Sequence, residues 1–132
     1  MTRPTEGETH TFERAFTNDE VRQFADLSRD TQSRHTDPDP EGRLLVHGLL
    51  TATLPTKIGG DLEVLASSMT FEFRQPVYTG QSITCRWLYE DVVKREDRYD
   101  LTADVVCENG HGDTVLTATI EGIVWDDGSN DG

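Results

Sequence analysis

Two histidines and an aspartate lie close together in the segment LSRDTQSRHTDPDPEGRLLVHGLL, residues 27–50. Asp30 and His35 are five positions apart, and His47 precedes Gly48 at the start of an apolar run. A carboxylate and an imidazole on one short loop can both hydrogen-bond a single water molecule and move its proton. These residue types therefore allow general acid–base chemistry on water.

Each of these residues also has an ordinary structural explanation. An aspartate after a helix is a common turn former, and a histidine in a polar loop is more often a surface residue. His47 can orient the loop or satisfy a buried carbonyl group, and we prefer that role for it. The alternating acids between His35 and Glu41 lack the glycine and the distal glutamate of a calcium-binding EF-hand loop, so we expect a solvated loop and no metal.

Local signals predict the elements that position these residues. Alternation from Glu8 to Phe16 indicates a strand. Thr17 and Glu20 have the spacing of a capping box, which predicts a helix that ends near Leu27 to Arg29. Asp30 then lies just beyond the C-terminal end of that helix.

A polar loop from Thr31 to Arg43 and then a buried apolar helix are expected next. The helix corresponds to LLVHGLLTATLPTKIGG and should close at the pair Gly59–Gly60. Pro55 lies inside it, where a proline removes one backbone hydrogen bond and clashes with the preceding turn. We therefore expect a kink or an early end at about Leu54.

The rest of the chain predicts an antiparallel sheet. Four segments rich in β-branched and aromatic residues are separated by turn signals; they cover residues 65–77, 81–93, 99–109 and 114–125. One domain of α+β class over residues 1–132 follows, with a helix against one curved sheet and an acidic C-terminal tail at about 126–132. We expect Met69, Phe71 and Phe73 in the core.

The charge balance excludes some partners. The 25 acidic residues against 12 basic ones give a net charge of −13, which repels nucleic-acid backbones and anionic lipid, so we expect no nucleic acid and no membrane as partners. Dispersed acids with few lysines are typical of proteins that stay soluble at high salt. Cys85 and Cys107 indicate small buried hydrophobes in a reducing compartment, hence a cytoplasmic protein.

Three separated motifs occur in a recognisable order. They are FTNDEVRQFADLSRDTQSRH at 16–35, LVHGLL at 45–50 and FRQPVYTGQSI at 73–83. With the predicted layout, they resemble the MaoC-like (R)-specific enoyl-CoA hydratases and dehydratases, whose pattern is F-T-x-x-D-V-x-x-F-A-x-x-S-G-D-x-N-P-x-H, then I-x-H-G-M-L, then F-x-x-P-V-x-x-G-D. Arg29 stands at the family's glycine, Gln32 and Ser33 at its Asn-Pro, and the connection from His35 to His47 is shorter.

The resemblance implies a fold, a reaction and roles. The fold is the hot-dog fold, a curved antiparallel sheet wrapped around a central apolar helix. The reaction is reversible hydration of trans-2-enoyl-CoA to (R)-3-hydroxyacyl-CoA, without metal or redox cofactor, with Asp30 and His35 as the acid–base pair. The N–H of Gly48 is the expected oxyanion donor, Gln32 takes the place of the asparagine, and His47 lies beside the substrate.

The resemblance also implies partners and leaves alternatives open. The substrate is an acyl-CoA, and Arg43 and Lys57 are candidate contacts for its phosphates. Related domains pair, so we expect a homodimer or a dimer of dimers. Hot-dog domains also hydrolyse thioesters, and a non-catalytic acyl-thioester-binding subunit is a further alternative.

Overall fold

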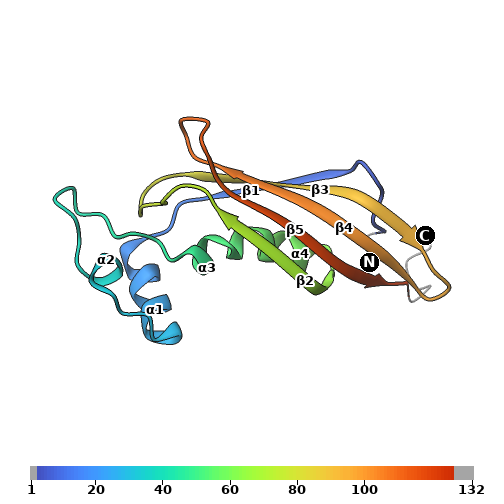
Figure 1. Cartoon of the computed structure of the whole chain (residues 1–132), viewed down its shortest axis with the longest axis horizontal. Helices are drawn as coiled ribbons and strands as arrows, with labels where there is room; N and C mark the ends of the chain where they lie inside the picture. The colour runs from blue at the N-terminus through green and yellow to red at the C-terminus, as the bar shows by residue number, and fades with distance from the viewer. Residues whose placement is uncertain (1–2, 127–132) are drawn as a thin grey trace.

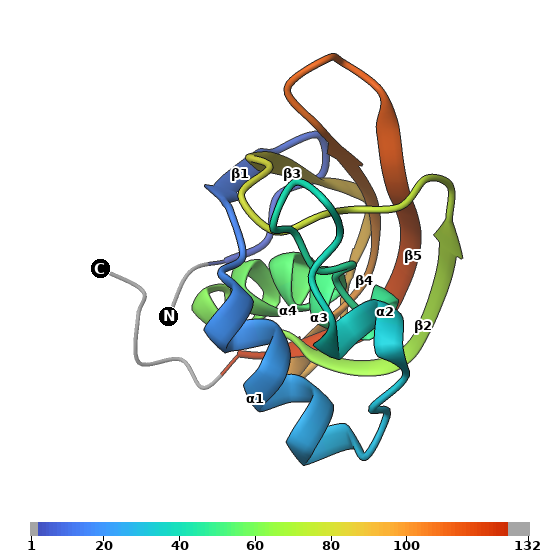
Figure 2. The same ribbon diagram turned by 90° about the vertical axis from the view of Figure 1, so that its left-hand side faces the viewer.

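The computed structural model of the chain describes residues 3–126 and shows one curved antiparallel sheet around a helix (Figures 1 and 2). The strand order in the sheet is β1-β3-β4-β5-β2. The strands are β1 (Thr9–Arg14), β2 (Leu65–Phe73), β3 (Ile83–Lys94), β4 (Arg98–Glu108) and β5 (Thr114–Trp125). All four neighbouring pairs are antiparallel. The predicted α+β class and the five predicted strands are confirmed.

Helix α4 (Thr53–Asp61) lies along the concave face of the sheet, and Figure 2 shows the strands curving around it. The sheet turns alternate residues toward this helix, as the alternating burial of β4 shows. Leu54 and Ile58 of the helix join Trp87 and Tyr89 of β3 in one buried core. The sheet wrapped around a central apolar helix is the hot-dog arrangement that the motifs predict.

Helix α1 (Asn18–Ser28) begins and ends where its sequence signals predict. The Thr17 hydroxyl accepts a hydrogen bond from Glu20 N at 3.1 Å, and the Glu20 carboxylate accepts one from Thr17 N at 2.9 Å. The helix ends at Ser28, and Arg29 has a left-handed backbone with φ of 67°. Glycine adopts this conformation at the lowest cost. This explains the glycine at the same position in the motif of the family that the sequence resembles.

The segment predicted as a polar loop contains a short helix. Residues Ser33–Thr36 form a single turn, α2, in which Asp37 N donates to Ser33 O at 2.8 Å. The prediction of a polar loop from Thr31 to Arg43 was therefore wrong for the residues of this turn. Four residues are too few to show a periodicity, and the burial of His35 stabilises the turn through tertiary contacts.

The predicted single apolar helix is two helices preceded by a segment that is not helical. Within residues 44–47, Leu45 forms an isolated β-bridge with Tyr78, and Val46 N donates to Val77 O at 2.8 Å. Helix α3 (Gly48–Thr51) is separated from α4 by Ala52. The kink or early end expected at about Leu54 is instead a break between two helices at Ala52. Pro55 lies in the first turn of α4, where its missing N–H is tolerated.

The glycine pair does not close the helix, contrary to our expectation. Helix α4 continues through Gly59 and Gly60 to Asp61. A Cβ on Gly59 would lie 3.3 Å from the Trp87 ring. Gly59 therefore allows the helix to lie close to the sheet instead of ending it.

Strand β2 is an edge strand and is largely exposed. Met69 is 39% exposed and Phe73 is 54% exposed, and Phe71 is half-buried against the core. The prediction of Met69 and Phe73 as core residues was therefore wrong. Both side chains lie on an edge strand of the sheet, at the edge opposite to β1 and β3, which α4 contacts.

Three other expectations concern the rest of the chain. Cys85 and Cys107 face each other across β3 and β4 as buried, unlinked thiols, in agreement with their predicted role. Within residues 3–126, no helix is long and apolar enough to cross a membrane. Apart from Asp126, the expected acidic tail lies outside the described residues.

Candidate active site

The predicted acid–base residues line one open cavity of about 540 Å³. It lies where α1, α2 and the start of α3 meet the end of β2. Its polar wall comes from α1 and the segments after it, and its apolar wall from three exposed or half-buried side chains. The lining residues are Phe24, Ser28, Asp30, His35, His47, Gly48, Leu49 and Phe73.

Asp30 follows the left-handed Arg29 and presents its carboxylate to the cavity. Gln32 Nε2 donates to Asp30 Oδ1 at 2.9 Å, and Asp30 N donates to Ser28 Oγ at 3.2 Å. The side-chain hydrogen bond from Gln32 is the main cause that lowers the pKa of Asp30; desolvation opposes it, and the backbone N–H of Gln32 and the neighbouring histidines lower the pKa by smaller amounts. The carboxylate is therefore ionised at neutral pH.

His35 is a buried residue and not a surface histidine. It is 5% exposed, and its Nδ1 lies 2.7 Å from the carbonyl oxygen of Leu45. A carbonyl only accepts hydrogen bonds, so Nδ1 carries the proton and Nε2 carries a lone pair in the neutral ring. That lone pair is on the atom nearest to Asp30.

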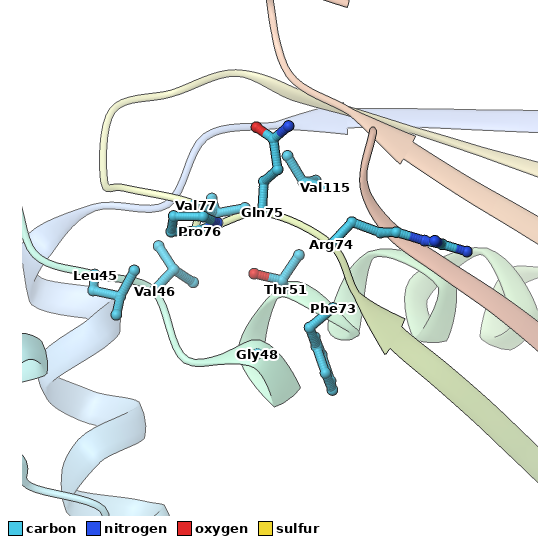
Figure 3. Close-up of a pocket in the computed structure, with 10 residues that line it drawn as sticks. All are labelled: Leu45, Val46, Gly48, Thr51, Phe73, Arg74, Gln75, Pro76, Val77 and Val115. Atoms are coloured by element: carbon cyan, nitrogen blue, oxygen red, sulfur yellow. The ribbon is translucent and has the colours of Figure 1, made fainter. Parts of the chain in front are cut away.

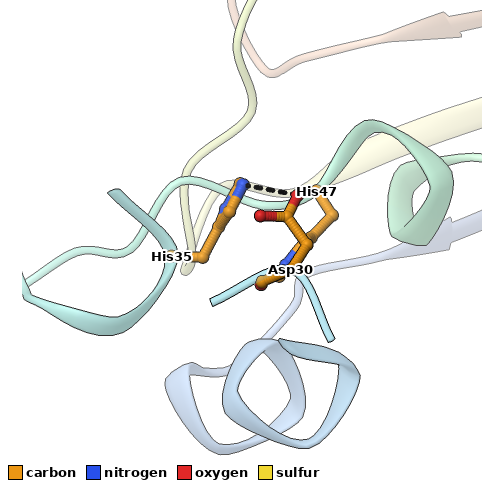
Figure 4. Close-up of side chains that lie close together, drawn as sticks. All are labelled: Asp30, His35 and His47. Atoms are coloured by element: carbon orange, nitrogen blue, oxygen red, sulfur yellow. Dashed lines mark hydrogen bonds and ion pairs between the residues drawn. The ribbon is translucent and has the colours of Figure 1, made fainter. Parts of the chain in front are cut away.

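The distance between Asp30 Oδ2 and His35 Nε2 is 3.7 Å (Figure 4). With a neutral imidazole, both atoms are acceptors, and the distance exceeds that of a direct hydrogen bond. A contact of this length between polar atoms is suited to a bridging water. One water molecule could donate a hydrogen to each atom, which is the arrangement that acid–base chemistry on water requires.

His47 contacts both members of the pair. Its Nε2 lies 3.0 Å from the backbone carbonyl oxygen of Asp30, so Nε2 carries the proton. Its ring stacks on His35, with centroids 3.6 Å apart and planes 14° apart. His47 thus forms a hydrogen bond to a backbone carbonyl, the kind of contact that we prefer for it, at a partly buried position.

Among the described residues 3–126, Asp30, His35 and His47 form the one group of three such side chains that lie close enough together to hold a metal ion. Their potential ligand atoms lie within 4.8 Å of one another. However, the two imidazole rings are nearly parallel, whereas ligands of one ion must aim their lone pairs at a common point. The cluster is therefore better arranged for acid–base chemistry than for coordination.

Gly48 is the first residue of α3, where a backbone N–H has no partner within its helix. It lines the cavity with the acid–base pair. Helix α3 is only four residues long, so the N–H itself, more than a helix dipole, would stabilise negative charge there. A Cβ on Gly48 would lie 2.7 Å from Phe73 Cε1, so a larger residue at this position would have to displace the Phe73 ring.

Two of the predicted substrate contacts do not line the cavity. Arg43 pairs with Asp39 at 3.0 Å and stacks over the Tyr78 ring. Lys57 pairs with Asp61 on α4 and lies over a phenylalanine of β1. Both cations are held by carboxylates of the protein itself, and the structure does not bring them to the acid–base pair. Gln32 does not line the cavity, but it donates a hydrogen bond to Asp30, which does.

Sequence reasoning missed the apolar wall of the cavity. Phe24, Leu49 and Phe73 form it, and we assigned none of them to a site. The motif phenylalanine at the start of FRQPV was the available signal for Phe73. Gly48 and Phe73 also separate this cavity from a neighbouring one of about 250 Å³, which Figure 3 shows between the end of β2 and the segment before α3.

Comparison with known proteins identifies the fold. No protein-family profile matches the chain. The (R)-hydratase from A. caviae involved in PHA biosynthesis superposes with a TM-score of 0.81 at 24% identity, over 96% of this chain and 100% of that one. The chain has the fold of the MaoC-like (R)-hydratases. A MaoC-like dehydratase from Rhodospirillum rubrum has a TM-score of 0.76 at 16% identity, over 92% and 93% of the two chains.

One curated relative shares sequence as well. It is the mitochondrial 3-hydroxyacyl-[acyl-carrier-protein] dehydratase of Arabidopsis thaliana, 27% identical over 112 residues. The match covers 78% of this chain and spans 66% of that protein. The resemblance to MaoC-like proteins that the motifs predict is thus confirmed for the fold.

Proposed function

We propose that the protein hydrates trans-2-enoyl thioesters to (R)-3-hydroxyacyl thioesters and catalyses the reverse dehydration. The observation that supports this most directly is the 3.7 Å separation of Asp30 Oδ2 and His35 Nε2. Two acceptors at this distance can hold and orient one water at the wall of an open cavity. The named relatives, an (R)-hydratase and a 3-hydroxyacyl dehydratase, support the same reaction class.

The proposed hydration step needs neither a metal ion nor a redox cofactor. The water oxygen bonds to C3 of the enoyl group while one of its O–H bonds breaks. Asp30 and His35 accept that proton and return a proton to C2, so that OH and H add to the same face. During addition, negative charge develops on the thioester oxygen, and Gly48 N–H donates a hydrogen bond to it.

The substrate we propose is an acyl-CoA in the cytoplasm. An acyl-carrier-protein thioester is the alternative that the curated relative raises. Electrostatics does not separate the two, because this chain carries a net charge of −13 and both carriers are anionic. Parallel assays with the same acyl group on CoA and on acyl carrier protein decide the carrier by the ratio of kcat/KM values.

One assay tests the reaction itself. Purified protein is mixed with crotonyl-CoA in molar KCl, and both the enoyl absorbance and free thiol are followed. Hydration lowers the absorbance without thiol release. We expect Asp30→Asn and His35→Gln each to lower kcat by at least about 100-fold. Thiol release would instead indicate a thioesterase, and binding with neither signal would indicate a non-catalytic subunit.

We propose in addition that two copies pair through β2. Every residue of this edge strand is at least partly exposed, and an unpaired edge is a template for another strand. Leu65, Met69 and Phe73 are large exposed apolar residues on it. A second copy would bury them and lie beside the cavity that Phe73 lines.

Light scattering in molar salt tests the pairing. We expect the mass of a dimer or a dimer of dimers for the natural chain. Met69→Glu at the middle of β2 should shift the mass toward that of a single chain. The matched control is Val93→Glu, which changes another exposed apolar residue on β3, away from this edge. A natural chain that is monomeric in molar salt contradicts the proposal.

A further inference from the structure

His47 lies between three elements that form the cavity. It is 4% exposed and immediately precedes α3. One face of its ring stacks on His35 of α2, and Phe24 of α1 contacts it edge-on with centroids 4.9 Å apart. The His47 ring therefore joins α1, α2 and the start of α3, which supply the polar wall.

The contacts of His47 act on both members of the acid–base pair at once. Its Nε2–H donates to the Asp30 carbonyl, which fixes the backbone from which the carboxylate extends. Its ring faces the His35 ring at 3.6 Å, which restricts rotation of that imidazole. The Leu45 carbonyl restrains His35 from its other nitrogen. One side chain thus helps to set the positions of both Asp30 Oδ2 and His35 Nε2.

We propose that His47 is a positioning residue for the acid–base pair. This inference rests on the proposed function, because it concerns the water held between Asp30 and His35. His47 acts through its two neighbours and not on the reacting atoms. Misplacement of catalytic groups by about 1 Å can cost on the order of 100-fold in rate, so loss of either contact lowers kcat.

Two variants separate the contacts. His47→Gln places an amide nitrogen near the position of Nε2, so a donor to the Asp30 carbonyl can remain while the stacked ring is lost. His47→Phe retains a ring against His35 and Phe24 but removes the donor, which leaves the Asp30 carbonyl without that hydrogen bond. His10→Gln is the matched control, because His10 of β1 also makes an edge contact, to Tyr89, and does not line the cavity.

The measurement is steady-state hydration of crotonyl-CoA by the full chain in molar KCl. We expect each His47 variant to lower kcat by about 10- to 100-fold with KM changed less than about 3-fold. His10→Gln should keep the natural kcat. Each variant is assayed below its own unfolding transition, followed by circular dichroism, so that the rates refer to folded protein.

A double-mutant cycle tests the route of the effect. In the Asp30→Asn background, measured at high enzyme concentration, His47→Gln and His47→Phe should lower the residual rate less than about 3-fold, because the pair they position is already broken. An equal loss in both backgrounds, or natural kcat in both His47 variants, overturns the inference. If the natural chain does not hydrate crotonyl-CoA, the proposed function fails first, which is a distinguishable result.

Discussion

The ring of Phe73 lies so close to Gly48 that no other residue fits at position 48 without movement. A Cβ on Gly48 would lie 2.7 Å from Phe73 Cε1 and 2.9 Å from Cδ1. The two residues come from different elements, the start of α3 and the end of β2. Their contact forms the boundary between the site cavity and its neighbour.

The Gly48→Ala variant tests this contact. We expect it to lower the free energy of unfolding by about 1 kcal/mol, because the added methyl group displaces a ring that is 54% exposed and has room to move. The loss should be recovered when Phe73→Ala is added, so that the double variant matches Phe73→Ala within about 0.5 kcal/mol. Urea unfolding of the natural chain, the two single variants and the double variant measures the coupling between positions 48 and 73. Additive losses in the double variant would contradict the contact.

Gln32 controls the ionisation of Asp30. Its side chain makes the hydrogen bond that is the largest cause of the lowered pKa of Asp30. Gln32→Ala should therefore raise that pKa toward its ordinary value, as measured by carboxyl NMR titration. A lowered carboxyl pKa stabilises the folded chain above the unfolded pKa of about 4, and that contribution is lost as pH falls through the folded value.

The same pKa predicts a pH dependence of stability for Gln32→Ala. The natural chain should be more stable than the variant at pH 7, and the difference should shrink as the pH falls below about 4. Gln23→Ala on α1, which changes another glutamine outside the cavity, serves as the control. An unchanged pKa of Asp30 in Gln32→Ala would show that the hydrogen bond is absent in solution.

Arg29 holds a backbone conformation that favours glycine. Its φ is 67° at the C-terminal end of α1. A left-handed conformation costs a residue with a Cβ roughly 1–2 kcal/mol, while glycine adds about 0.4–1 kcal/mol of unfolded-state entropy. Arg29→Gly should therefore raise the free energy of unfolding by about 0.5–1 kcal/mol. Arg22→Gly, inside the same helix, should lower it by about 1 kcal/mol. Thermal unfolding compares the two.

Tyr89 has a buried hydroxyl without a hydrogen-bond partner among the described residues. Burial raises the pKa of Tyr89 to about 12. Removal of an unsatisfied buried group of this kind is close to neutral or stabilising, so Tyr89→Phe should change the free energy of unfolding by about 0 to +1 kcal/mol. A loss of more than about 1 kcal/mol in urea unfolding would mean that the hydroxyl is bonded in solution.

Glu90 and Asp104 lie together on neighbouring strands, and their contact raises the pKa of Glu90. A raised carboxyl pKa means that ionisation of Glu90 destabilises the folded chain at pH 7 and that this cost is relieved as pH falls. Glu90→Gln should therefore raise Tm in 0.1 M KCl. In 2 M KCl the gain should be smaller, because salt screens exposed charges. An equal gain at both salt concentrations would contradict a repulsive origin.

Short-range signals predicted much of the fold. The capping box of Thr17 and Glu20 places the start of α1, and alternation places the strands, because both depend on neighbours within a few residues. The pairing of Asp30 with His35 was also predictable, since five positions separate them and the motif order supports them. The predicted position of Asp30, just beyond the C-terminal end of α1, is also confirmed, because it depends only on the local signals of that helix.

Only the tertiary structure decided how these pieces form a site. The turn of α2, the break at Ala52 and the contact of Phe73 with Gly48 depend on segments far apart in the chain. The burial of His35 beneath His47 also depends on such packing. By itself, the sequence determined which residues are candidates for acid–base chemistry and the helix end after which Asp30 lies. Tertiary packing decided their 3.7 Å separation and the wall of the cavity, because side-chain contacts between distant segments leave no local periodicity.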